Sequence, residues 1–252
     1  MTDLLIENAG AVRVLTLNRP EKRNALNDPL VAALKSALTD ADADDGLRSI
    51  VIRGAGKDFC SGADLESLRT ISENSYQDNL KDARSLAELF ELIRRVRIPV
   101  IAAVHGRALA GGCGLATACD LLLATESARF GYPEVKIGFV PAIVMAFLRR
   151  NVTEKLAFEI ATRGFEFSAQ DAERFGIVSR IYPEDGFDAE VANYAAEYEK
   201  LSRSAVMLTK SLLYEIDSLD FGAAMEAGAK ANAEARMTED CKQGIARFLD
   251  KT

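Results

Sequence analysis

Residues 101–115, Ile-Ala-Ala-Val-His-Gly-Arg-Ala-Leu-Ala-Gly-Gly-Cys-Gly-Leu, decide the fold of this chain. The apolar residues at the start predict a buried strand, and the small residues that follow predict a tight turn into a helix. The first N–H groups of such a helix have no partner inside it and point outward. The glycine spacing fits neither the dinucleotide fingerprint nor a P-loop. The turn therefore predicts a helix start whose amides can bind an oxyanion.

A second turn of this kind lies upstream, at Phe59-Cys60-Ser61-Gly62-Ala63-Asp64-Leu65. It follows a short buried strand expected at Ser49–Ile52, and Asp64 is expected to begin the next helix. Taken alone, the segment could be a plain strand-to-helix turn. Two turns that present outward amides can also converge on one carbonyl oxygen, and we hold this as the functional hypothesis.

The loop Asn18–Asn27 carries Arg19, Lys22 and Arg23, although the net charge of the 252-residue chain is −7. The acidic balance argues against nucleic acid as a partner and gives no broad attraction to a polyanionic substrate. A phosphate-bearing ligand would need a local basic edge, which this loop could supply. The alternative is a solvated loop that ends in a helix cap.

Glu134 stands between Pro133 and Val135 in an apolar segment. A carboxylate in apolar surroundings has a raised pKa and can act as a base or acid near neutral pH, whereas an exposed loop glutamate is the alternative. The chain has one histidine, His105, which excludes a metal site built from several histidines. Its place at the end of an apolar strand predicts a structural role rather than a catalytic one.

The periodicity divides the chain into an α/β core and a helical tail. Residues 4–17 predict a hairpin, and short strands then alternate with helices, which predicts parallel strands covered by helices. Beta character almost ends at Ile177–Ile181. We expect residues 1–185 to form the core with the active site, and residues 186–252 to form a helical region that serves oligomerisation and covers the substrate site.

The cysteine pattern and the start of the chain bear on its compartment. None of the four cysteines stands in a Cys-x-x-Cys pair, and the first residues lack a signal-peptide layout. No apolar run approaches the roughly 20 residues that span a membrane. We expect a cytoplasmic protein with reduced thiols and no membrane contact.

Together these segments resemble the crotonase superfamily, also called the enoyl-CoA hydratase/isomerase family, over nearly the whole chain. The resemblance implies a spiral of ββα units with a C-terminal helical region, a homo-trimer or hexamer, and acyl-CoA chemistry of the kind found in fatty acid metabolism. The motifs that carry it are Asn18-Arg19-Pro20, Phe59-Cys60-Ser61-Gly62-Ala63-Asp64-Leu65, Ile101-Ala102-Ala103-Val104, Ala108-Leu109-Ala110-Gly111-Gly112-Cys113, Cys119-Asp120 and Phe130-Gly131-Tyr132-Pro133-Glu134.

The resemblance also implies roles for particular residues. The N–H groups of Ala63 and Gly111 would bind the thioester carbonyl, and Glu134 would move protons. No metal is implied, and coenzyme A would enter as part of the substrate rather than as a cofactor. The positions that would contact substrate or coenzyme A are Lys22, Arg23, Ala25, Ala63, Asp64, Leu65, Glu66 and Gly111.

Three positions depart from the family pattern. Gly114 stands where the family often has a second catalytic carboxylate, and it is expected to face the same cavity as Gly111 because it lies one helical turn away. The apolar stretch Phe139–Phe147 replaces a glycine-rich segment and is expected to reshape the acyl pocket. Glu66 stands where a basic residue is common. Glu66, Glu73 and Asp82 remain candidates for a replacement carboxylate.

A single glutamate favours moving a proton between C2 and C4, which converts a 3-enoyl thioester into a 2-enoyl thioester. Hydration usually engages two carboxylates, although one glutamate could accept a proton from water and return it to C2. We weigh enoyl-CoA hydratase and enoyl-CoA isomerase about equally. The alternatives are a weakly active binding or scaffold protein, and an acyl-CoA thioester hydrolase or decarboxylase on the same fold.

Overall fold

The larger of two sheets has six strands in the order β1-β2-β3-β4-β6-β9, in a computed structural model that describes residues 2–64, 69, 71 and 73–250. β1 (Leu4–Ala9) and β2 (Val12–Leu17) form the expected antiparallel hairpin. The other neighbours in this sheet pair in parallel. Their bounds are β3 (Ser49–Gly54), β4 (Val100–Val104), β6 (Leu121–Thr125) and β9 (Arg180–Tyr182).

The smaller sheet consists of β5 (Arg107–Leu109), β7 (Arg129–Gly131) and β8 (Glu166–Ser168). β5 pairs in parallel with β7, and a bridge between Cys60 and Ala108 brings the turn after β3 to the same sheet. The chain thus passes repeatedly through a strand of the larger sheet, a short strand or bridge of the smaller sheet, and a helix. The predicted α/β spiral is confirmed.

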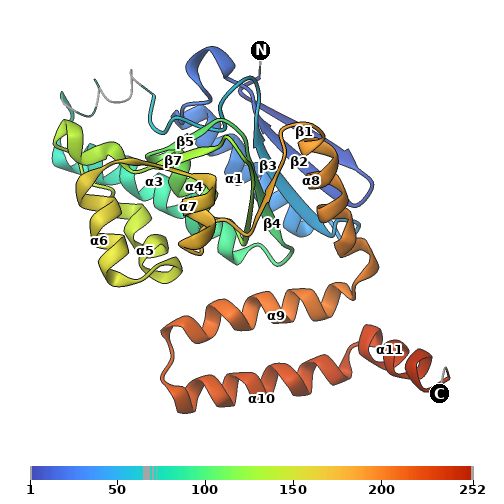
Figure 1. Ribbon diagram of the computed structural model, residues 1–252. Coiled ribbons are helices and arrows are strands. Elements are labelled where there is room, and N and C mark those ends of the chain that lie inside the picture. The colour runs from blue at the N-terminus through green and yellow to red at the C-terminus, as the bar shows by residue number, and fades with distance from the viewer. Residues whose placement is uncertain (1, 65–68, 70, 72, 251–252) are drawn as a thin grey trace.

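Helices cover both faces of the larger sheet (Figure 1). α1 (Asp28–Ala43), α3 (Tyr76–Arg95) and α4 (Gly111–Ala118) bury their apolar residues against one face, and α8 (Phe187–Ala196) packs against the other. α1 begins as predicted, because the Asn27 side chain accepts a hydrogen bond from the N–H of Leu30 at 3.0 Å. Successive strand residues point to opposite faces, so β2, β3, β4 and β6 each contribute buried residues to both apolar clusters.

Two helices were not predicted from the sequence. α5 (Ala142–Asn151) lies in the apolar stretch that was interpreted as part of an acyl pocket, and only its Val144, Phe147 and Leu148 are buried. α11 (Glu239–Leu249) lies inside the predicted helical region, but it was not predicted as a separate helix. The helices α6 (Glu154–Arg163) and α7 (Ala169–Arg174) follow α5 in the chain.

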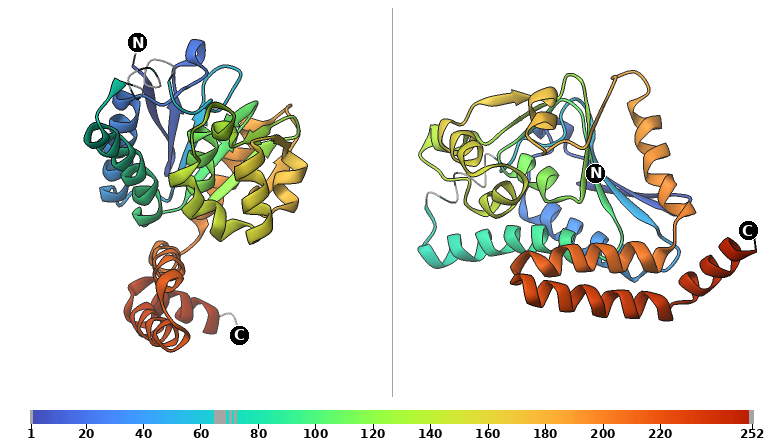
Figure 2. Two further views of the ribbon diagram at one scale, coloured as in Figure 1. Left: turned by 90° about the vertical axis from the view of Figure 1, so that its left-hand side faces the viewer. Right: turned by 60° about the horizontal axis from the view of Figure 1, so that its bottom comes forward.

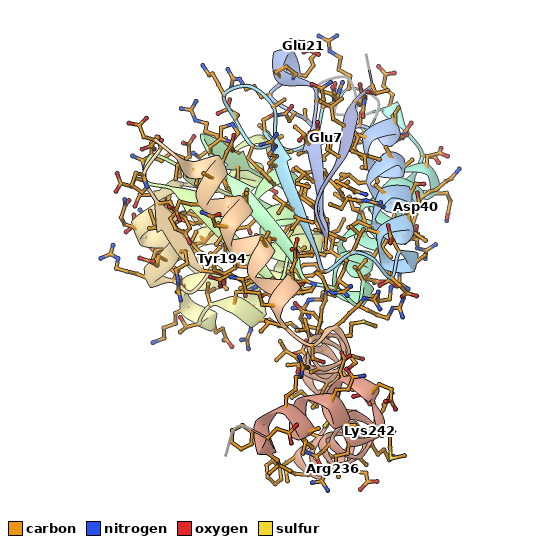
Figure 3. The ribbon with its side chains drawn as sticks, turned by 90° about the vertical axis from the view of Figure 1, so that its right-hand side faces the viewer. Glu7, Glu21, Asp40, Tyr194, Arg236 and Lys242 are labelled. Atoms are coloured by element: carbon orange, nitrogen blue, oxygen red, sulfur yellow. The ribbon has the colours of Figure 1, made fainter. Side chains whose placement is uncertain are left out.

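The C-terminal helices α9 (Arg203–Glu215), α10 (Phe221–Met237) and α11 extend beyond the core (Figures 1 and 2). α9 is fastened to the core by Lys210, whose Nζ lies 2.7 Å from Asp120 Oδ2 and donates to two carbonyls near the end of α3. Tyr214 donates to the other Asp120 oxygen at 2.6 Å. Figure 3 labels Arg236 and Lys242 on the part of this tail that lies away from the core.

Candidate active site

The two small-residue turns meet at the start of α4. A carbon atom placed on Gly62 in the direction of a side chain would lie 3.2 Å from the Gly111 nitrogen and 2.8 Å from Ala110 Cβ. Ala63 bridges to Leu26, and the hydrogen bonds of this bridge use the N–H groups of Leu26 and Asp64. Among the described residues, no backbone hydrogen bond is donated by the N–H of Ala63 or of Gly111. Both amides are therefore available to a ligand.

Strained backbone accompanies this junction. Ala110 has φ 49° and ψ −127°, a region that residues with a Cβ rarely adopt, and its N–H donates to the Gly131 carbonyl at 2.8 Å. Gly62 has φ 94°, where the missing side chain is needed both for this conformation and for the close approach of Ala110. Strain of this kind costs about 1–3 kcal/mol per residue and gathers at functional sites.

Arg19 holds the first loop and the Ala63 turn together. Its guanidinium lies 2.7 Å from Asp64 Oδ2, and both side chains are largely buried. The predicted basic edge therefore consists of the exposed Lys22 and Arg23, because Arg19 is already paired inside the protein. Ala25 is buried beneath this loop.

Glu134 lies in the short 3-10 helix η2 (Pro133–Ile137) and is 9 % exposed. Its Oε2 has no hydrogen-bond partner among the described residues. Burial raises the pKa of the Glu134 carboxyl above its ordinary value, in the direction that suits a proton-transfer group. The alternative interpretation of Glu134 as an exposed loop residue is therefore wrong.

The space in front of Gly114 is already filled, which its spacing from Gly111 did not indicate. A Cβ on Gly114 would lie 2.2 Å from Val144 Cγ1 and 3.1 Å from the Phe90 ring, whereas the corresponding direction at Gly111 faces Leu26 and Leu86. The two positions thus face different neighbours. α5 brings Val144 against α4 and fills the space that a second carboxylate would need.

The remaining predicted positions do not all lie close to Gly111 and Glu134. Leu65 and Glu66 lie outside the described residues. A groove of about 670 Å³ runs between the start of α1 and α3, and it is lined by Asp64 and Asp82 but not by Gly111 or Glu134. Glu73 is exposed. Burial and the nearby Asp28 raise the pKa of Asp82.

The contact of the His105 side chain with the backbone is consistent with the structural role predicted for it. The His105 Nε2 lies 2.9 Å from the Gly56 carbonyl oxygen. In the described part of the chain, no three or more His, Cys, Asp or Glu side chains gather as a metal site would require. None of the helices in the described ranges is both long enough and apolar enough to cross a membrane.

Three side chains near the site had no role assigned from the sequence. Val144 closes the space beside Gly114. Thr117 and Tyr132 share a buried hydrogen bond of 2.9 Å between α4 and the residue that precedes η2. The signal that could have indicated the Tyr132 contact is a phenol next to a predicted catalytic segment, since a buried tyrosine hydroxyl needs a partner.

This fold is that of an acyl-CoA enzyme family. The sequence matches the enoyl-CoA hydratase/isomerase family over residues 7–252, and the chain belongs to that family. The 2,3-dehydroadipyl-CoA hydratase of Escherichia coli is 34% identical over 100% of this chain and 97% of that protein. An enoyl-CoA hydratase crystal structure from Mycobacterium smegmatis has a TM-score of 0.95 at 34% identity, covering 99% of this chain and 96% of that one.

A relative in Mus musculus, enoyl-CoA hydratase domain-containing protein 3, is 31% identical over 95% of this chain and 79% of that protein. The human protein of the same name has a crystal structure with a TM-score of 0.94 at 30% identity, covering 99% of this chain and 98% of that one. The predicted crotonase-like fold is thereby confirmed, as is membership of the family that the motifs indicated.

Glu134→Gln is expected to make the protein more stable at neutral pH. Burial raises the pKa of Glu134 in the folded state, so the contribution of its protonated form to stability is fully present below the unfolded-state pKa. This contribution is lost as pH rises through the folded-state pKa. The glutamine side chain is uncharged at every pH. Melting temperatures of the two proteins should therefore be similar in acid and diverge towards neutral pH, and a difference that does not depend on pH would contradict this.

Proposed function

We propose that this protein stabilises a thioester enolate with the N–H groups of Ala63 and Gly111 and moves the proton with Glu134. The support is geometric: both amides lack backbone acceptors at one junction, and Glu134 is buried with a raised pKa. Charge develops on the thioester oxygen when a proton leaves C2, and each donor aimed at that oxygen contributes about 10²–10³ in rate. Lys22, Arg23, Ala25 and residues 63–66 would line the coenzyme A path.

Among the reactions open to the family, the site favours double-bond isomerisation. The observation that carries this choice is the Val144 side chain beside Gly114, which leaves an apolar wall where a second carboxylate would stand. Glu134 would take a proton from C2 of a 3-enoyl thioester and give a dienolate. The same proton would then go to C4, which moves the double bond from C3–C4 to C2–C3. One carboxylate suffices for both transfers.

Hydration is the second candidate, because it is in the name of relatives such as the Escherichia coli 2,3-dehydroadipyl-CoA hydratase. In that reaction Glu134 would accept a proton from the attacking water and return a proton to C2. Without a second carboxylate, the water would be held in place by fewer groups. The wall at Val144 is thus expected to slow hydration more than isomerisation.

Two assays with the enone absorbance as readout separate these reactions. Isomerisation of a short 3-enoyl-CoA raises this absorbance, and hydration of crotonyl-CoA lowers it. We expect the first to have the larger kcat/KM. Faster hydration would assign the hydratase reaction instead, and absence of both activities in a protein that binds the thioesters would indicate a scaffold.

We propose further that the protein works as a homo-oligomer, a trimer or hexamer, in the cytoplasm. The tail exposes large apolar side chains that a second copy could cover: Leu213, Phe221, Met225, Met237, Ile245, Phe248 and Leu249. All four cysteines are free thiols. Sedimentation at micromolar concentration should give a multiple of 27.4 kDa, and a monomer would contradict the proposal.

A further inference from the structure

Tyr132 connects the helix that begins at Gly111 with the turn that carries Glu134. Its side chain is fully buried, and its hydroxyl lies 2.9 Å from Thr117 Oγ1 on α4. The Thr117 hydroxyl donates to the Cys113 carbonyl at 2.8 Å. A threonine hydroxyl has one proton and a carbonyl can only accept, so the Tyr132 hydroxyl must be the donor to Thr117.

The chain is thus held to α4 at two points just before Glu134. The Ala110 N–H donates to the Gly131 carbonyl at 2.8 Å, at the start of α4, and Tyr132 reaches Thr117 farther along the same helix. Pro133 follows directly, and its ring restricts the backbone between Tyr132 and Glu134. A displacement of Tyr132 therefore moves Glu134 relative to the Gly111 amide.

Glu134 needs such external positioning because few hydrogen bonds orient its carboxylate. Its Oε2 accepts no hydrogen bond from the described residues, and none of the described side chains donates a hydrogen bond to either carboxylate oxygen. Catalytic bases are usually oriented by a third group that hydrogen-bonds to them. Here the backbone that carries the base is held instead.

We propose that Tyr132 and Thr117 form a positioning pair that sets Glu134 against the Gly111 amide, an inference that rests on the proposed function. Neither residue is assigned contact with substrate. Their contribution is to geometry, and a displacement of the order of 1 Å at a reacting group can cost about 10²-fold in rate.

The test uses Tyr132→Phe and Thr117→Val, which remove the hydrogen bond with little change in shape, in the full-length protein with a short 3-enoyl-CoA. We expect kcat to fall about tenfold or more in each, with KM within about twofold, because the loss is in alignment rather than in binding. Thr117→Val also removes the hydrogen bond to the Cys113 carbonyl, so the double variant should be no worse than Thr117→Val alone. Thr117→Ser keeps a hydroxyl and should restore most of kcat.

Tyr214→Phe is the matched control, because it removes a part-buried tyrosine hydrogen bond of 2.6 Å from the tail to Asp120. It should lower the melting temperature and leave kcat unchanged. The proposal is overturned if Tyr132→Phe and Thr117→Val keep kcat within about twofold of wild type, or if Thr117→Ser is as slow as Thr117→Val. Should Tyr132→Phe fail to fold, the comparison of Thr117→Val with Thr117→Ser decides alone.

Glu134→Gln in the same assay distinguishes a failure of the positioning pair from a failure of the proposed function. If it is inactive while Tyr132→Phe and Thr117→Val behave like wild type, only the positioning pair is wrong. If Glu134→Gln turns over like wild type, the proposed function is wrong and the positioning pair falls with it.

Discussion

Glu134→Gln is expected to lower kcat by about 10²–10⁴-fold, the range that a positioned acid or base contributes. The substitution keeps the size and shape of the side chain and removes the group that accepts the C2 proton. Binding of the acyl-CoA thioester should change by no more than a few-fold, because the proposed contacts to the thioester oxygen come from Ala63 and Gly111. Steady-state kinetics with 3-enoyl-CoA and crotonyl-CoA, together with a binding titration, measure both effects.

Glu173→Gln is the control for this experiment, because Glu173 is an exposed glutamate in α7. It should leave kcat and binding unchanged. A Glu134→Gln protein that retains more than about a tenth of the wild-type kcat on its best substrate would exclude Glu134 as the proton-transfer group, given the size of effect expected for that role.

In the wild-type protein, the Glu134 carboxylate is expected to raise activity and to lower stability for the same reason. Burial in apolar surroundings makes the carboxylate form costly in the folded state, and the same burial brings its pKa closer to the pH at which it works. Glu134→Gln should therefore be the more stable and less active protein. Such opposite effects at one residue distinguish a functional carboxylate from a structural one, whose loss would lower stability.

Local sequence patterns predicted much of the fold because each pattern depends only on residues close together in the sequence. The strands around residues 50 and 102, the Asn27 cap and the turn at Gly111 each depend on neighbours within a few positions. The ion pair between Arg19 and Asp64 joins residues 45 positions apart, and no periodicity in either segment indicates it. The basic edge was predicted from charge alone, so Arg19 was included in it, although burial has removed it from the surface.

At Gly114, too, local sequence patterns could not indicate a contact with a distant segment. Its spacing from Gly111 on one helix was a valid argument that both lie near the same face, yet the outcome depends on what packs there. Val144 comes from α5, a helix that the sequence did not predict, and it occupies the space in front of Gly114. A side-chain direction can be inferred from helix geometry, but the neighbour that meets it comes from a distant segment.

Gly114→Ala is expected to destabilise the protein, although alanine normally favours a helix over glycine by about 1 kcal/mol. The new Cβ would lie 2.2 Å from Val144 Cγ1, and overpacking of this kind costs about 1–3 kcal/mol. Gly228→Ala is the matched control, because Gly228 lies in α10 with no atom within 4 Å of the added carbon. Thermal melting should show a lower Tm for Gly114→Ala and an equal or higher one for Gly228→Ala, at unchanged oligomeric state.

Combining Gly114→Ala with Val144→Ala should recover part of the stability, because the double variant removes the atom that meets the new Cβ. The coupling between the two substitutions is expected to be about 0.5–3 kcal/mol in favour of the pair. Simple additivity of the two losses would show that Val144 does not restrict this position.

Gly114→Glu should be the most damaging change at this position, since it directs a carboxylate into the wall formed by Val144 and Phe90. An unpaired buried charge costs several kcal/mol on top of the overpacking, so the single variant is expected to fold poorly and to gain no hydratase activity. Gly114→Glu with Val144→Ala makes room for the carboxylate. If the missing carboxylate is what limits hydration, this folded double variant should have a higher ratio of hydratase to isomerase activity than Val144→Ala alone. An unchanged or lower ratio would remove the main support for isomerisation as the preferred reaction of the single-glutamate site.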